Sequence, residues 1–147
     1  MAEGYDYLLE PNEDLFLVVG VGNHMGSKKQ YLVSGKICEQ NYVPNSITPS
    51  DRSQFFQNQI SLDDEEQNEF PVTFRLLQVD ELDNSLYISI ISVNDEIVTV
   101  NCTSSWDPEK MGFLFQLFFE LWVYDDSISD FAYDNRFVKL WINVSPY

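Results

Sequence analysis

The hydrophobic pattern begins with two segments of strand length near the start of the chain. Residues 14–21 (DLFLVVGV) form an uninterrupted apolar run, which is typical of a strand covered on both faces. Turn-forming residues follow at positions 22–27 (GNHMGS), and residues 30–39 (QYLVSGKICE) have the length and composition of a returning strand. We therefore predict that these two strands pair with each other as a β-hairpin.

Three later segments alternate regularly between apolar and polar residues. They are residues 72–76 (VTFRL), 86–90 (LYISI) and 98–102 (VTVNC). A period of two indicates strands that have one face on the core. The connections at 80–84 (DELDN) and 94–95 (ND) are short and rich in turn residues. The pattern predicts an antiparallel meander of three strands.

The longest apolar stretch, residues 111–124, is interpreted as a helix. Its apolar side chains recur at helical spacing, and only a narrow polar line separates them. Upstream, Ser105 or Asp107 can cap the helix. Pro108 suits its first turn, and Glu109 complements its dipole. The stretch is shorter than the ~20 residues that cross a bilayer. We expect a long apolar helix that packs on the sheet.

The remaining segments complete an α+β prediction. Residues 40–70 are expected to form a long acidic loop or to contain a short helix, for which residues 51–59 are the candidate. Residues 136–144 (RFVKLWINV) are expected to be the last strand. The element order is ββ, long loop, βββ, α, β, which indicates a mainly antiparallel sheet with one helix across it. The length of 147 residues fits a single domain, 1–147.

Charge is the one compositional property that is far from ordinary. The chain has 24 Asp and Glu residues against 8 Lys and Arg, which gives a formal net charge of −16. Such a field repels nucleic-acid backbones and anionic membranes, so we expect neither as a direct partner, and it attracts basic proteins. The alternative is that the acidic residues only keep an aromatic-rich protein soluble.

The sequence suggests a cytoplasmic protein with reduced thiols. Its acidic beginning lacks the positive and apolar regions of a signal peptide. Cys38 and Cys102 are the only cysteines, and two cysteines do not make a disulfide framework. We therefore expect both thiols to be free.

No catalytic or metal-binding motif stands out. Residues 20–29 (GVGNHMGSKK) miss the spacing of phosphate-binding loops and are interpreted as a turn. His24 is the only histidine, and zinc would need a cluster of Cys and His. Asp125, Asp126 and Asp130 lack the glycine and spacing of a calcium loop. We expect no metal, no cofactor and no enzymatic activity.

The acidic segments are the better functional candidates, because acidic faces select basic partners and accelerate their association. Neighbouring aromatic residues could anchor an interface. The candidate partner-binding residues are Asp63, Asp64, Glu65, Glu66, Glu69, Asp125, Asp126, Asp130, Asp134, Phe131 and Tyr133. Acids at 80–83 form a third segment. The alternative is that acids collect in loops simply because loops are solvated.

These features favour an inhibitor that neutralises a basic protein by occlusion. By physical analogy, such a protein would be an immunity protein or antitoxin, or a DNA mimic, that acts on a nuclease or another nucleic-acid-binding enzyme. One alternative is a secretion or assembly chaperone that binds through the apolar surface of residues 111–124. Another is a small enzyme without a recognisable motif. The same apolar surface could also form a homodimer.

Overall fold

The protein has an all-β fold. The computed structural model describes residues 6–39, 42 and 53–145, and no helix occurs among them. The α+β prediction is therefore wrong. The described residues form the strands β1 (Asp6–Leu9), β2 (Asp14–Gly22), β3 (Lys29–Glu39), β4 (Ser53–Leu62), β5 (Gln67–Leu82), β6 (Ser85–Val93), β7 (Glu96–Asp107), β8 (Gly112–Asp125) and β9 (Asp130–Val144).

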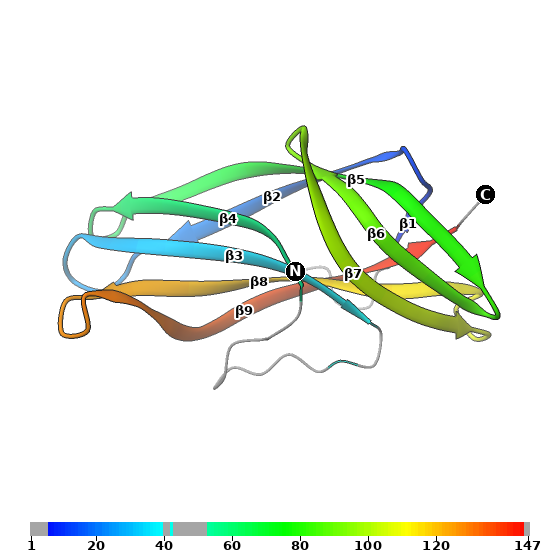
Figure 1. The fold of residues 1–147 in the computed structure, drawn as a ribbon. Coiled ribbons are helices and arrows are strands. Elements are labelled where there is room, and N and C mark those ends of the chain that lie inside the picture. Colours follow the sequence, from blue (N-terminus) through cyan, green and yellow to red (C-terminus); the bar gives the residue numbers. More distant parts are fainter. Residues whose placement is uncertain (1–5, 40–41, 43–52, 146–147) are drawn as a thin grey trace.

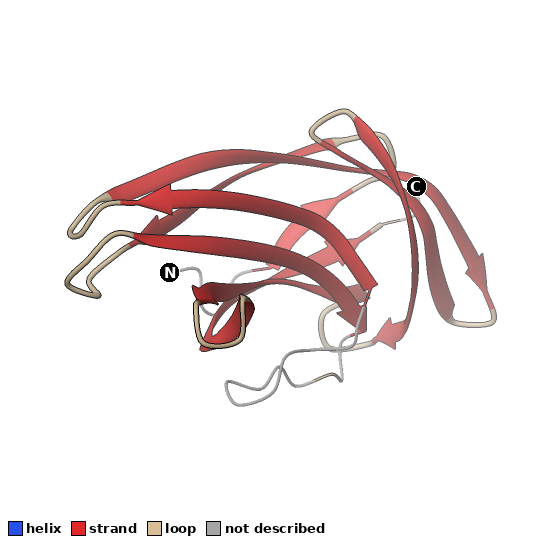
Figure 2. Ribbon diagram, turned by 60° about the vertical axis from the view of Figure 1, so that its left-hand side comes forward, coloured by secondary structure: helices blue, strands red, loops and turns tan. Residues whose placement is uncertain are grey.

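The strands form one strongly curved sheet that folds over onto itself (Figures 1 and 2). Its main order is β1-β9-β8-β7-β6-β5-β2, and β3 lies between β8 and β4. All pairs are antiparallel except β1 with β9. Long strands twist, so a sheet of this size curls into a barrel-like shape around one core. The order ends at β2, which leaves the barrel-like sheet open along that edge.

The segment predicted as a helix is the long central strand β8. One face, with Phe113, Phe115 and Leu117, joins the main core. The opposite face, which includes Gln116 and Phe118, is also buried. Burial of both faces removes the alternation of a half-buried strand, and the resulting continuous apolar run resembled a broad helical surface.

The apparent helix cap at the start of this segment is part of a tight turn. The Asp107 carboxylate accepts hydrogen bonds from the backbone N–H groups of Glu109 (2.9 Å) and Lys110 (3.2 Å). Met111 then adopts a positive φ of 55°, and β8 starts at the next residue. Aspartate caps turns by the same hydrogen bonds that cap helices, which explains why the local signal was ambiguous.

The predicted meander is confirmed as β5, β6 and β7. Antiparallel pairing joins β5 to β6 and β6 to β7. Asp83 and Asn84 have positive φ values of 48° and 62°, and Asn94 and Asp95 have values of 50° and 66°. Two consecutive residues with positive φ define the tight hairpin turns that Asn and Asp tolerate best.

The other early predictions are correct in part. The strands expected at 14–21 and 30–39 exist as β2 and β3, but they do not pair with each other. β2 pairs with β5, and β3 pairs with β4 and β8, so the turn between β2 and β3 joins two parts of the curved sheet. In the region 40–70, residues 53–62 form strand β4 instead of a short helix. Residues 51–52 lie outside the described residues.

A buried ion pair connects β3 to β8 on the outer face of the sheet. Lys36 Nζ lies 2.6 Å from Glu120 Oε1, and both side chains are almost fully buried. Removing one partner from a buried ion pair leaves an uncompensated charge. This lowers the stability of the fold more than replacing both partners with apolar residues does.

We expect Glu120→Leu to lower the free energy of unfolding by about 3–5 kcal/mol, because Lys36 would remain buried without its counter-ion. The double variant Lys36→Met/Glu120→Leu should recover most of that loss. Urea unfolding of the two variants measures the difference. A double variant less stable than the single one would show that the pair is not the source of the effect.

Candidate functional site

Three turns lie together at one end of the molecule, on the left of Figure 1. They are the turns β2–β3, β4–β5 and β8–β9, at residues 23–28, 63–66 and 126–129. We call this region the turn end. It carries all eleven residues that the sequence indicated for partner binding, at or next to the last two turns. The turn end therefore brings together two acidic segments that lie about sixty residues apart in the sequence.

Asn23 fixes the β2–β3 turn to the β4–β5 turn. Its amide group is fully buried and donates to the backbone carbonyls of Ser27 (2.9 Å), Leu62 (2.9 Å) and Asp63 (3.2 Å). Its side-chain oxygen accepts hydrogen bonds from the Tyr31 hydroxyl and the Met25 N–H, both at 3.0 Å. One side chain thus satisfies groups from both turns and holds them in a fixed relation.

The acidic β4–β5 turn uses several of its own carboxylates for structure. Asp64 Oδ1 accepts the Gly26 N–H at 2.9 Å, and Glu66 Oε1 accepts the Asp63 N–H at 2.8 Å. Glu65 Oε2 lies 3.0 Å from His24 Nδ1, and both side chains are exposed. These contacts order the turn, while the carboxylates stay at the surface.

The β8–β9 turn is ordered by Asp125. Its Oδ1 accepts the N–H of Ser127 at 2.9 Å and the hydroxyl of the same residue at 2.6 Å. These hydrogen bonds, with a smaller contribution from the Lys29 charge, lower the pKa of the Asp125 carboxyl below its ordinary value. Lys29, at the start of β3, therefore lies close enough to this turn for its charge to act on Asp125.

The charges of β9 also act on the Asn23 network. Burial is the main cause that raises the pKa of the Tyr31 hydroxyl, and the negative charge of Asp134 raises it further. Arg136 opposes this effect, and its Nε donates to Asp134 Oδ2 at 2.8 Å. Asp134 therefore lies near the buried centre of the turn end.

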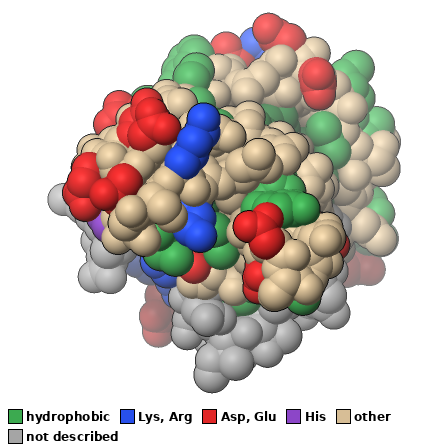
Figure 3. Space-filling view, turned by 90° about the vertical axis from the view of Figure 1, so that its left-hand side faces the viewer, with side chains coloured by type: hydrophobic (Ala, Val, Ile, Leu, Met, Phe, Trp, Pro, Cys, Tyr) green, Lys and Arg blue, Asp and Glu red, His purple; other side chains and the backbone are tan. Residues whose placement is uncertain are grey.

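The turn end is acidic but mixed in charge. Figure 3 views the molecule from this side and shows acidic side chains in separate groups, with basic side chains between them. Lys28 lies in the β2–β3 turn, Lys29 starts β3, and Arg136 lies in β9. The third acidic segment, 80–83, lies at the β5–β6 turn at the opposite end of the molecule (Figure 1). The structure brings two of the three acidic segments together.

The two aromatic candidates lie in cross-strand pairs. Phe131 packs edge to face against Tyr124, and Tyr133 packs against Trp122, with ring centroids 5.5 Å apart in each pair. Both residues are partly buried. Such pairs stabilise the β8–β9 hairpin, so the two rings support the turn end from the side.

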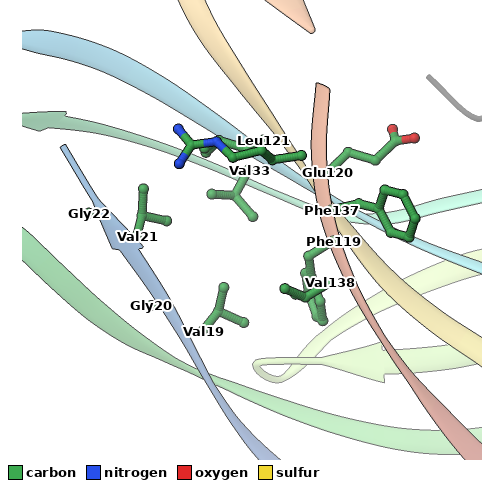
Figure 4. A pocket seen from close by; sticks show the side chains of 11 residues that line it. Val19, Gly20, Val21, Gly22, Val33, Phe119, Glu120, Leu121, Phe137 and Val138 are labelled. Carbon is green, nitrogen blue, oxygen red and sulfur yellow. The ribbon is translucent and has the colours of Figure 1, made fainter. Parts of the chain in front are cut away.

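A cleft of about 430 Å³, which sequence reasoning missed, opens between β2 and β9. Val19 and Val21 of β2 and Val138 of β9 point into it, and Val33 and Phe119 form its floor (Figure 4). Its lining also includes Arg136, and a second hollow along β2 continues from it toward His24.

The edge strand β2 also differs from its prediction. Residues 14–21 were expected to be covered on both faces, but Phe16 and Val18 are 73% and 69% exposed. The inward-facing residues of the same strand are buried or partly buried. When both faces of a strand carry apolar residues, the sequence pattern does not indicate which face is solvated. The sequence therefore could not show that one face of β2 is exposed.

His24, Cys38 and Cys102 are not among the residues that line this cleft. Cys38 and Cys102 are buried and are not joined by a disulfide. Within the residues that the structure describes, no group of three His, Cys, Asp or Glu side chains is arranged to hold a metal ion. The same residues include no helix with the length and apolar character needed to cross a membrane.

Comparison with protein-family models found no match, and comparison with curated proteins found none either.

We expect Asn23→Ala to lower the free energy of unfolding by about 2–4 kcal/mol, because it leaves several buried backbone and hydroxyl groups without partners. Asn68→Ala, at an exposed position of β5, is the matched control and should change stability by about 0.5 kcal/mol or less. Urea unfolding monitored by tryptophan fluorescence measures both. Equal effects would contradict the role given to Asn23.

The lowered pKa of Asp125 gives a pH prediction. The ionised carboxylate stabilises the fold above the ordinary Asp pKa of 3.8, and this contribution is lost as the pH falls through the lowered value. Carboxyl ¹³C titration should place the midpoint of Asp125 below 3.8. In Ser127→Ala the midpoint should rise, because one hydrogen bond to the carboxylate is gone. An unchanged midpoint would refute this cause.

Proposed function

We propose that this protein binds and occludes a basic protein through its turn end. The observation that carries the proposal is the convergence of the acidic segments 63–69 and 125–134 at one end of the molecule, beside an open cleft. The net charge of −16 gives the whole molecule an attractive field for a cationic surface.

The mechanism is competition for cationic side chains. Exposed carboxylates such as Asp63, Glu69 and Asp126 would pair with Lys and Arg residues that otherwise hold nucleic acid. Long-range attraction would accelerate the encounter, and the rigid turns would fix the geometry of the complex. A nuclease, or another enzyme that binds nucleic acid, is the class of partner with such a surface.

The rigidity of the turn end favours this proposal. The Asn23 network joins two of the three turns, and Asp125 and Ser127 order the third. A surface that is ordered before binding loses less conformational entropy when it meets its partner. The carboxylates on ordered turns are therefore better suited to recognition than carboxylates on mobile loops.

The alternatives have less structural support. A chaperone that binds through residues 111–124 would need their apolar side chains at the surface, but most of those in β8 are buried. A small enzyme would need reactive groups that converge in a pocket. His24 is exposed and contacts Glu65, while both cysteines are buried.

Charge reversal of the turn end tests the proposal. We expect the triple variant Asp63→Lys/Glu69→Lys/Asp126→Lys to associate at least about tenfold more slowly with its basic partner at low salt, because electrostatic steering is lost. The side chains that order the turns stay intact in this variant. Partners retained from host lysate at low salt and released at high salt would be purified, and their association rates measured by biolayer interferometry.

The matched control is Asp80→Lys/Glu96→Lys/Glu109→Lys, which changes the net charge equally at exposed positions outside the turn end. Its association rate should fall much less. Equal slowing by both variants would show that only net charge matters and would overturn the assignment to the turn end. Retention of no basic protein at low salt would overturn the proposal itself.

A further inference from the structure

The cleft lies along two strand edges that carry no partner strand within the described part of the chain. Among the described residues, β2 pairs only with β5, so its other edge is unpaired over its whole length. In the same part of the chain, β9 pairs with β1 only from Trp141 to Val144, and its preceding part pairs only with β8. Unpaired edges offer rows of backbone N–H and C=O groups to an added strand.

The edge of β2 lacks the features that usually prevent association. Natural edge strands are protected by charged residues, proline or bulges. From Leu15 to Gly22 this strand contains only apolar residues and glycine, and its pairing with β5 has no irregularity. Phe16 and Val18 are exposed on its outer face. The edge is therefore long, regular and apolar.

The cleft matches the side chains of a strand added to this edge. Residues of the added strand opposite Val19 and Val21 would point inward with them, because facing residues in a sheet share a face. Their side chains would enter the apolar space that also contacts Val33, Phe119 and Val138 (Figure 4).

The outer face of the added strand would meet a carboxylate. Gly20 is paired with Glu69 and Gly22 with Gln67. Since glycine has no side chain, nothing on β2 stands between Glu69 and a side chain opposite Gly20. A Lys or Arg at that position of the added strand could reach over Gly20 to Glu69. The edge thus favours apolar residues inward and basic residues outward.

We propose that an extended segment of the partner, with alternating apolar and basic residues, adds as a strand to the edge of β2. The inference rests on the proposed function, because it assigns the partner's contact segment to the same end of the molecule. A second copy of this chain is a poorer occupant, since each copy carries a net charge of −16.

A synthetic peptide pair tests the strand addition. The probe is a labelled peptide of about nine residues, the length of a long strand, in which Val and Lys alternate. The comparison peptide has the same composition with Val and Lys in two separate blocks. We expect the alternating peptide to bind at least about tenfold more tightly in fluorescence anisotropy, and to slow hydrogen exchange in β2.

Two variants of equal charge locate the binding edge. Val18→Lys places a cation on the β2 edge and should weaken binding of the alternating peptide by about tenfold or more. Ile97→Lys makes the same change at a residue that is 74% exposed on β7, and it should leave the affinity nearly unchanged. Circular dichroism would verify that both variants are folded.

Several results would overturn the inference. One is equal affinity for the two peptides, and another is equal weakening by Val18→Lys and Ile97→Lys. Self-association without peptide that Val18→Lys abolishes would assign the edge to a second copy. Binding of lauric acid in the cleft, with no binding of the alternating peptide, would assign it to an apolar small molecule.

The turn-end double variant Asp63→Lys/Asp126→Lys separates this inference from the proposed function, because it leaves Glu69 beside the β2 edge unchanged. If both peptides bind equally and both lose affinity in Asp63→Lys/Asp126→Lys, the acidic surface is confirmed and strand addition is refuted. If the preference for the alternating peptide persists in that variant while basic partners still associate at the normal rate, strand addition is confirmed and the charge-based proposal is refuted.

Discussion

Strand β8 is buried on both of its faces, and this double burial determines where the strands beside it lie. Its inner face supplies Phe113, Phe115 and Leu117 to the core, and its outer face buries Phe118 and the carboxylate of Glu120. Apolar burial contributes roughly 25 cal/mol per Å² to folding stability. A strand that is buried on both faces therefore contributes more than a strand with one solvated face. Because β3 and β9 pair along β8, their positions, and the turns they lead into, follow from it.

The turn end shows how carboxylates can serve structure and recognition together. Asp64, Glu66 and Asp125 accept hydrogen bonds that order their turns, yet each remains partly or fully exposed. Charge–dipole contacts with backbone N–H groups reduce the repulsion that a dense set of acids would otherwise create. The basic residues Lys29 and Arg136 act in the same direction. The structure can therefore hold several acidic groups at one end of the molecule without losing order.

The sequence predicted the half-buried parts of the fold well and the fully buried or edge parts poorly. The meander β5–β6–β7 was predictable because one face is solvated and its Asp-Asn and Asn-Asp turns are distinctive. β8 was mistaken for a helix because double burial erased its period. The acidic candidates were predictable by composition, but their convergence depends on strand order, which no local pattern encodes. Asn23, Arg136 and the cleft were missed for the same reason.

The parallel pairing of β1 with β9 has a consequence for how the chain reaches its native state. Asp6 meets Trp141 and Leu9 meets Val144, so this contact closes nearly the whole described chain. The hairpins of the meander close loops of two residues and can form in microseconds, whereas distant segments meet only after the intervening strands have ordered. β1 should therefore be the last element to dock and the first to detach.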